Sequence, residues 1–489
     1  MLDYRPDLES DDYRILDSAN YVIPFNGGYR TSMAAEASGY NTALSTACIG
    51  ARAVKNDAGT VRALFGLAAA IYESDGASGW TDRSRGGGYT SGSNRWWFSQ
   101  GIAANEVIAC NYADEMQVST GAAFSNLTNA PKARIVVAQS EALLAMYYND
   151  GTAYTNGIKI SDRGASTTWT PAVSNEATAV RLVESPGEIV AGASINDEVI
   201  AWKRRSMYVG RYVGGDDPWQ FNLKSNYIGC LGLEAWVSTP AGIIFASENG
   251  VYLYDGSFPR QIDNGLTATL RTQFVSDNSY GATAQMSHDE YHGCVFLWIP
   301  DAGGSGSDIC FSYSYRDDRW SVAYGTSLGA GATHTGFQQQ VRDYSIIDHK
   351  NLAGSTPTSV YVGHFIVSDQ KKLINLANDG DTGLDGFAPT LQTKRFQLAN
   401  EPNGIGTIKT VFPIWGKSPA EPTAGSCDVT TYNYPGSLTA ISTVSSSTVS
   451  SGRFNLMASG NNASVAISTD DKIFNLKDIA VDISPAGKA

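Results

Sequence analysis

The stretch Glu198–Phe221, EVIAWKRRSMYVGRYVGGDDPWQF, contains three strand patterns in succession and decides the fold class. An apolar strand, EVIAWK, runs into a basic turn, and a second strand, MYVGRYVG, follows. Gly214–Pro218 then turns the chain into Trp219–Phe221. Short runs of β-branched and aromatic residues that are separated by Gly, Asp and Pro favour antiparallel strands joined by tight turns. The stretch therefore predicts one antiparallel sheet unit.

Similar units recur along the chain. They begin near Val61, Asn105, Glu141, Gly242 and Gly293. The apolar strands have a spacing of roughly 45 to 50 residues, which is close to the period of a four-stranded propeller blade. This spacing predicts an all-β fold, a β-propeller of about seven blades. Blade counts of six or eight, and a pair of two-sheet sandwiches, remain open alternatives.

Four tryptophans occupy similar places after the turns of these units: Trp80, Trp169, Trp219 and Trp320. A large aromatic ring at such a place suits packing between adjacent blades.

The pattern divides the chain into three parts. Residues 1–40 are expected to form an N-terminal arm, residues 41–385 the propeller, and residues 386–489 a C-terminal β-sandwich. A propeller closes best when one blade takes strands from both ends of the repeat region, so Thr46–Lys55 is expected to complete a blade with Ser359–Gly363. Within the sandwich, the low-complexity stretch Ser442–Ser451 is predicted to be a long flexible loop.

Composition narrows the classes of function. The 489 residues carry a formal net charge of −13, which argues against a dominant nucleic-acid-binding surface. The one short basic cluster, Lys203–Arg205, is expected to be a solvated hairpin turn. Six dispersed cysteines without a CxxC pair predict reduced thiols in the core. The acidic start, Met1–Asp17, does not resemble a signal peptide, and no stretch approaches the roughly 20 apolar residues of a membrane helix. We therefore expect synthesis in the cytoplasm and no membrane-spanning segment.

Several motifs suggest chemistry, but a structural interpretation explains each of them better. Gly325–Gly329 matches the G-x-S-x-G nucleophile pattern, yet no helix follows it. The glycine-rich Gly86–Gly92 lacks the Lys-Ser/Thr of a phosphate loop. The spacing of His288 and His292 would suit a metal on a helix, but their surroundings predict a strand. The other histidines are His334, His349 and His364.

Acidic pairs stand at predicted turns, where Asp caps exposed backbone amides. They are Asp216–Asp217, Asp317–Asp318 and Asp470–Asp471. Ser161–Trp169 and Ser74–Trp80 resemble the Asp-box turns of sialidase propellers imperfectly, and such turns are structural. The sequence therefore predicts no enzyme, no catalytic residue, and neither a cofactor nor a metal site.

Four segments in order resemble a family of short-tailed bacteriophage proteins that includes packaged-DNA stabilisation proteins and tail nozzles. These segments are YVIPFNGGYR (Tyr21–Arg30), PKAR (Pro131–Arg134), GIIFASENGVYLYDG (Gly242–Gly256) and IAVDISPAG (Ile479–Gly487). The resemblance covers most of the chain and contains no catalytic motif. It implies a hexameric ring below the portal and adaptor proteins.

The resemblance predicts a virion structural protein, a nozzle or head-to-tail stopper that retains packaged DNA and passes it at ejection. Its expected partners are copies of itself, portal and adaptor proteins, tail fibres or tailspikes, and double-stranded DNA in transient passage. An acidic surface suits such a low-adhesion conduit. Two alternatives remain open: a propeller glycosidase acting on host surface polysaccharide, and a receptor-binding, lectin-like module with the same fold.

Overall fold

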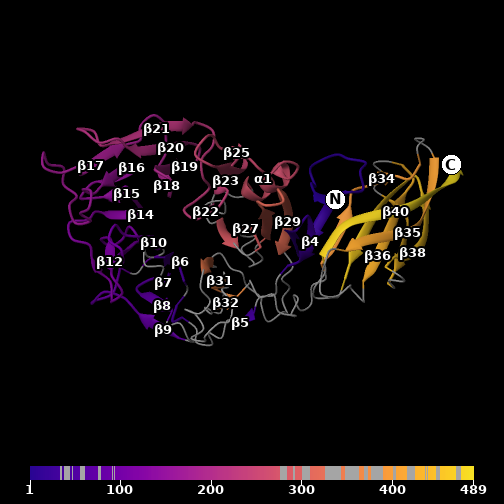
Figure 1. The fold of residues 1–489 in the computed structure, drawn as a ribbon, viewed down its shortest axis with the longest axis horizontal. Helices are drawn as coiled ribbons and strands as arrows, with labels where there is room; N and C mark the ends of the chain where they lie inside the picture. The colour runs from indigo at the N-terminus through magenta and orange to yellow at the C-terminus, as the bar shows by residue number, and fades with distance from the viewer. Residues whose placement is uncertain are drawn as a thin grey trace.

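The computed structural model is built almost entirely of β-strands (Figure 1). It describes residues 1–32, 36–37, 44–46, 48–55, 61–74, 79–90, 92, 94–275, 284–289, 292–299, 309–324, 343–346, 363–367, 373–375, 389–399, 404–415, 425–434, 437, 439–447, 452–469 and 475–488. Within these residues there is one helix, α1 (Thr267–Val275). No helix in the described ranges is long and apolar enough to cross a membrane.

The described residues form seven units of four strands; six are separate sheets, and the sixth along the chain is the first part of an eleven-stranded sheet. The first unit contains β6 (Gly50–Lys55), β7 (Val61–Gly66), β8 (Ile71–Ser74) and β9 (Trp80–Asp82). The second contains β10 (Trp97–Gln100), β11 (Val107–Cys110), β12 (Gln117–Ser119) and β13 (Ser125–Asn126). The third contains β14 (Lys132–Gln139), β15 (Ala142–Asn149), β16 (Ala153–Ile160) and β17 (Thr178–Arg181). The next two are β18 (Ile189–Ile195), β19 (Glu198–Lys203), β20 (Met207–Tyr212) and β21 (Trp219–Ser225); and β22 (Trp236–Thr239), β23 (Gly242–Ser247), β24 (Gly250–Tyr254) and β25 (Arg260–Gln261). The last two are β26 (Gln285–Asp289), β27 (Cys294–Ile299), β28 (Ile309–Ser314) and β29 (Arg319–Tyr324); and β30 (Asp343–Ile346), β31 (Gly363–Val367), β32 (Leu373–Asn375) and β5 (Glu36–Ala37).

These units are the blades of a closed propeller. The innermost strand β10 contacts β6 and β14, and β26 contacts β22 and β30. Strand β30 also contacts β6, so the last blade meets the first (Figure 1). The prediction of a propeller with about seven blades is confirmed.

The predicted closing strand is wrong. Strand β6, within the expected segment Thr46–Lys55, pairs with β7 in the first blade, where Gly50 lies opposite Gly66. The strand that completes the last blade is β5, in which Ala37 lies opposite Ile374. Since β6 to β9 already form a consecutive four-stranded unit, closure uses a strand further upstream. Residues 359–362 of the expected partner lie outside the described ranges.

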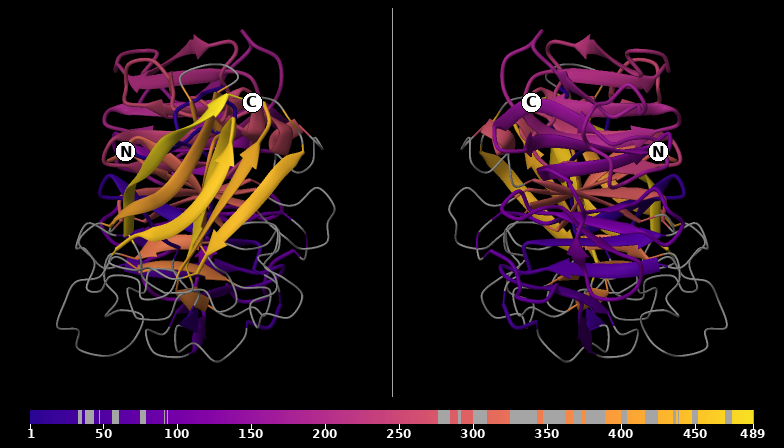
Figure 2. Two further views of the ribbon diagram at one scale, coloured as in Figure 1. Left: turned by 90° about the vertical axis from the view of Figure 1, so that its right-hand side faces the viewer. Right: turned by 90° about the vertical axis from the view of Figure 1, so that its left-hand side faces the viewer.

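Two sheets form the C-terminal β-sandwich, which confirms that part of the fold prediction. One sheet contains β33 (Thr390–Thr393), β34 (Phe396–Gln397), β36 (Ser426–Tyr432), β37 (Ala440–Ser446) and β39 (Asn462–Ser468). The other contains β35 (Gly404–Trp415), β38 (Phe454–Gly460) and β40 (Asn475–Lys488). Strand β38 alternates strictly between buried and exposed residues, as expected for a sheet with one face in a core. In the left view of Figure 2 these strands lie in front of the layers of blades.

The flexible loop predicted at Ser442–Ser451 is wrong for its first half. Residues 442–446 belong to β37, which pairs with β36 at the edge of the sheet. The hydroxyls of Thr430 and Thr443 lie 3.1 Å apart across this pair. A Ser/Thr/Val alternation fits a pleated strand when a partner supplies the backbone hydrogen bonds. Residues 448–451 lie outside the described ranges.

The N-terminal residues join the propeller to the sandwich. They form β1 (Asp3–Tyr4), β2 (Ile15–Asn20), β3 (Val22–Phe25) and β4 (Gly28–Thr31). Strand β2 pairs with β29 of the sixth blade and with β33 of the sandwich, so one sheet runs through both parts. Strand β4 pairs with β40, near the other end of the chain. The expected boundaries at residues 40 and 385 stay predictions, because the residues around them lie outside the described ranges.

Candidate functional site: a pocket on the propeller axis

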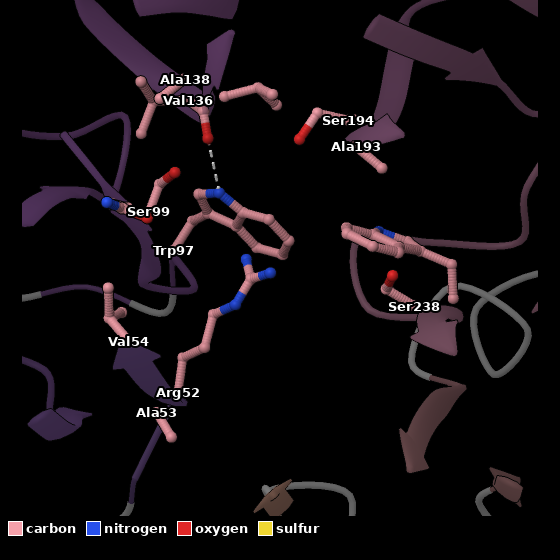
Figure 3. A pocket seen from close by; sticks show the side chains of 14 residues that line it. Arg52, Ala53, Val54, Trp97, Ser99, Val136, Ala138, Ala193, Ser194 and Ser238 are labelled. Atoms are coloured by element: carbon pink, nitrogen blue, oxygen red, sulfur yellow. Dashed lines mark hydrogen bonds between the residues drawn. The ribbon is translucent and has the colours of Figure 1, made fainter. Parts of the chain in front are cut away.

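A cavity of about 320 Å³ lies where the innermost strands of five blades converge. Each of β6, β10, β14, β18 and β22 contributes to its wall, so chain segments from Arg52 to Ser238 meet around it (Figure 3). Its volume lies within the usual range of small-molecule sites. A partly open space lined by several blades is a natural candidate for a binding site.

Arg52 is the central polar group of this axial pocket. Its guanidinium carbon lies 4.3 Å from the ring centroid of Trp97 and 5.7 Å from that of Trp236. Arg52 Nη1 donates a hydrogen bond to the backbone oxygen of Phe98 at 3.1 Å. Figure 3 shows the guanidinium group next to the Trp97 ring and directed into the space between strands from opposite sides. These contacts fix the position of the positive charge.

Both indoles are themselves held by the backbone. Trp97 Nε1 donates to the oxygen of Val136 at 2.8 Å, which links the second blade to the third. Trp236 Nε1 donates to the oxygen of Leu233 at 3.1 Å. The two ring centroids lie 5.8 Å apart. The aromatic walls are therefore oriented before any ligand arrives.

The pocket carries a net positive character. Burial lowers the pKa of Arg52 to about 10, and the negative charge of Glu234 opposes that shift. Arg52 thus stays protonated at neutral pH. Glu234 forms an ion pair with Arg95 at 3.1 Å. The residues that line the pocket in the described part of the chain include no Asp, Glu, His or Cys, and Ser99, Ser194 and Ser238 supply hydroxyls.

These groups are suited to binding rather than to covalent or acid–base catalysis. A guanidinium group offers planar donors to an oxyanion, and hydroxyls accept or donate hydrogen bonds to a polar ligand. Catalysis by a serine needs a base within hydrogen-bonding reach. None of the described lining side chains can serve as that base.

The histidine pair lies elsewhere, at the β26–β27 hairpin next to the N-terminal strands. His288 Nε2 lies 3.1 Å from the hydroxyl of Tyr315. His292 is buried, with Nδ1 2.5 Å from Asp289 Oδ2 and Nε2 3.3 Å from Arg30 Nη1. No group of three or more possible metal ligands occurs among the described residues. These contacts connect the sixth blade to β4.

The acidic pairs occupy turns as expected where the structure describes them. Asp317 Oδ1 accepts the amide of Gly27 at 3.2 Å, and Asp318 Oδ1 accepts the hydroxyl of Tyr313 at 2.7 Å. Asp216 and Asp217 lie exposed in the turn between β20 and β21. Asp470–Asp471 lies outside the described ranges.

The basic cluster forms a hairpin turn, but the prediction that it is solvated is wrong for its first residue. Lys203 is buried, and its Nζ donates to the backbone oxygens of Leu182 and Ser185 at 2.8 and 2.5 Å. Arg204 and Arg205 both pair with Glu248. The sequence pattern of this strand does not indicate that the Lys203 ammonium group has two backbone carbonyl oxygens as hydrogen-bond partners.

The Asp-box-like turn at Ser161–Trp169 is structural. Ser161 Oγ accepts the amide of Leu143 at 2.9 Å, and Asp162 Oδ1 accepts that of Glu176 at 2.9 Å. Trp169 is buried. Residues 75–78 of the second such turn, and all of Gly325–Gly329, lie outside the described ranges. So do His334 and His349, as does the side chain of His364.

Other predictions concern buried groups. All six cysteines are buried and free, which confirms the expected reduced thiols. Trp320, one of the four turn tryptophans, bridges two blades, because its Nε1 donates to the oxygen of Ile262 at 2.8 Å. Sequence reasoning missed Arg52, Trp97 and Trp236. The available signal was a single Arg inside the otherwise small and apolar run Gly50–Val54.

Comparisons with known proteins give no family. No protein-family model matches the chain, and no curated protein matches it. Among solved structures, the extracellular domain of a one-component system from B. thetaiotaomicron is similar at a TM-score of 0.44 and 10% identity, over 76% of this chain and 46% of that one. An ancestral GH74 enzyme is similar at a TM-score of 0.32 and 12% identity, over 60% of this chain and 35% of that one. Apo AztD from Citrobacter koseri is similar at a TM-score of 0.37 and 8% identity, over 96% of this chain and 98% of that one. The chain thus spans less than half the length of the first two.

Proposed function

We propose that this chain is a virion structural protein of a bacteriophage tail, a nozzle or stopper that forms a ring-shaped DNA conduit. The protein retains packaged DNA until ejection and is located in the tail after synthesis in the host cytoplasm. Its partners are further copies of itself in a ring of about six, set by cyclic symmetry, together with portal, adaptor and fibre proteins.

The observation that carries the proposal is the joint between the two ends of the chain. The segment Tyr21–Arg30 forms the β3–β4 hairpin, and Tyr29 lies opposite Leu476 of β40. Strand β40 contains Ile479–Gly487. Two of the four segments that resemble the phage family therefore build one sheet, although they stand at opposite ends of the sequence.

The same joint suits a protein that transmits mechanical load. One sheet continues from the sixth blade through β2 into the sandwich. The N-terminal ammonium group also pairs with Asp478 at 3.1 Å. A continuous hydrogen-bonded sheet holds two bodies more rigidly than a linker does. A direct sheet connection between the propeller and the sandwich supports the role of a conduit that withstands DNA pressure.

The location of the protein tests the proposal. Tailed particles produced by the genome that encodes the chain would be purified, and antibody-gold label for the chain would be imaged on them. The proposal predicts label at the tail, below the portal, in DNA-filled particles. Infectious particles that lack the chain, as measured by mass spectrometry, would contradict it.

The glycosidase alternative makes a different prediction. A glycosidase needs two carboxyl groups that face each other across the sugar. Incubation of the purified chain with capsule or lipopolysaccharide of the host would release reducing sugar if that alternative held. Our proposal predicts no release above that of a heat-denatured sample.

A further inference from the structure

We propose that the axial pocket binds a small oxyanion, a carboxylate or a phosphate group, through the guanidinium of Arg52. The inference concerns a ligand site and does not depend on the proposed place of the protein in a virion. It follows from the donors left available, from a positive charge without an ion-pair partner among the described residues, and from the lining of the walls.

The guanidinium group of Arg52 has hydrogen-bond donors available for a ligand. A guanidinium group carries five N–H donors. Within the described part of the chain, Arg52 uses one of them on the oxygen of Phe98. The ring centroids of Trp97 and Trp236 lie 4.3 and 5.7 Å from the guanidinium carbon and 5.8 Å from each other, so both rings lie on one side of the group, and Figure 3 shows it next to Trp97 and facing the cavity. The donors of a guanidinium group match the two oxygens of a carboxylate or a phosphate.

The positive charge of Arg52 also favours an anion. No described carboxylate lies within ion-pair distance of Arg52, and the charge of nearby Glu234 is shared with Arg95. Arg52 is half-buried, and a partly desolvated cation without a paired anion is costly, so a bound anion would relieve part of that cost. The pocket therefore favours anionic over neutral ligands.

The side chains that line the pocket also suit a small polar ligand. Ser99, Ser194 and Ser238 come from three different blades and place hydroxyls on the wall around the cation. The volume of about 320 Å³ admits a single sugar acid or a phosphate with its hydration water. Small side chains such as those of Ala53 and Ala193 lie on the wall of this space.

Calorimetric titration of the full chain tests the inference at low, matched ionic strength. The probes are glucuronate for the carboxylate, inorganic phosphate for the phosphate, and glucose as the neutral sugar of the same ring. We expect saturable binding of glucuronate, phosphate or both, with one ligand per chain, and no binding of glucose. The anion that binds with the higher affinity shows whether the site prefers a carboxylate or a phosphate group.

Variants assign the binding to Arg52. Arg52→Gln is expected to weaken the affinity by about tenfold or more, the loss that follows from removing a charged hydrogen bond. Arg52→Lys should weaken it less, because the charge remains but the planar pair of donors does not. Arg163→Gln, which changes a surface arginine, is the matched control and should leave the affinity unchanged.

A second variant covers the case in which Arg52→Gln does not fold, as judged by circular dichroism. Ser194→Phe fills the cavity from an exposed position and leaves the Arg52–tryptophan stack intact. It should also abolish anion binding. The inference is overturned if neither anion binds, if glucose binds as tightly as glucuronate, or if the affinity survives in Ser194→Phe and in folded Arg52→Gln.

Discussion

Arg52 shows how one charged side chain is kept in the middle of a propeller. Its charge lies against two tryptophan rings, and the attraction between a cation and an aromatic face offsets part of the lost hydration. The backbone hydrogen bonds of both indoles prevent the rings from moving away. The residue therefore stays in place, with its donors accessible from the cavity.

The pKa of Arg52 gives the anion site a pH dependence. Because burial lowers this pKa to about 10, the cation is present below that pH and is lost as the pH rises through it. Glucuronate stays ionised throughout this range. We predict that its affinity is flat between about pH 7 and 9 and falls as the pH passes 10.

Calorimetric titration at several pH values measures this dependence, and circular dichroism at each pH confirms that the chain stays folded. An affinity that stays constant to pH 11 in the folded protein would separate anion binding from the charge of Arg52.

Asp114 is a buried carboxylate that organises the connection between the first two blades. It accepts hydrogen bonds from Arg85, from the amide and hydroxyl of Thr90, and from Asn111. Burial opposes its ionisation, but the hydrogen bonds from Asn111 and Thr90 and the charge of Arg85 outweigh burial and hold the pKa of Asp114 below its ordinary value. The ionised form therefore stabilises the fold.

Asp114→Asn should lower the free energy of unfolding by about 1–3 kcal/mol at pH 7, since it removes charged hydrogen bonds at a buried site. A depressed pKa stabilises the folded state above the ordinary carboxyl pKa, and this contribution is lost as the pH falls through the folded pKa. The difference between wild type and variant should thus shrink below about pH 4.

Urea unfolding at pH 7 and pH 3 measures this effect, with Asp217→Asn at an exposed turn as the control. An equal loss at both pH values would assign the effect to shape rather than to charge.

The chemistry of individual residues was only partly predictable from the sequence. Buried cysteines and turn aspartates follow from local pattern, because strand interiors and turns have characteristic compositions. The pocket depends on Arg52, Trp97 and Trp236, which come from three blades. Their meeting is a consequence of ring closure, and spacing along the chain does not encode it.

The β3–β4 hairpin is the element that ties the two bodies together. The Tyr29 hydroxyl is buried, accepts the amide of Tyr4 at 2.8 Å, and donates to the backbone oxygen of Trp320 at 3.1 Å. Burial raises the pKa of Tyr29, so the donor proton is retained. One side chain thus links β1, β4 and the sixth blade.

Tyr29→Phe should lower the free energy of unfolding by about 1–3 kcal/mol, because it leaves a buried amide and a buried carbonyl oxygen without their partner. Thermal unfolding measures the loss. Tyr227→Phe removes a hydroxyl from an exposed tyrosine and serves as the control. An unchanged midpoint in Tyr29→Phe would show that the joint does not depend on this hydroxyl.

The existence of elements was easier to predict than their partners. The dipeptide Asn249–Gly250, a type that favours a two-residue hairpin turn, lies at the β23–β24 hairpin, but Ser247 pairs with Gly250, so the two-residue loop is Glu248–Asn249. Hydrogen bonds from Arg204 to Glu248, and from Asn249 to the oxygen of Tyr227, hold that loop. Partners this far away in the sequence outweigh the local preference for an Asn-Gly turn.

At the scale of the whole molecule, the repeat spacing predicted the propeller because six of the seven blades use four consecutive strands, and the last takes its fourth strand, β5, from the N-terminal region. The entry of β2 between β29 and β33 was not predictable from local pattern. A strand at the edge of a blade accepts any strand that covers its free hydrogen-bonding groups. Here the N-terminal residues supply that strand, and they join the propeller to the sandwich.

Assembly into a ring is the central claim of the proposed function, and negative-stain electron microscopy of the purified full chain tests it directly. The protein would be imaged alone and after mixing with adaptor rings from the same genome. The account predicts closed rings of about six copies around a central channel, formed alone or on the adaptor. Monomers under both conditions, at concentrations where the adaptor ring itself is intact, would contradict it.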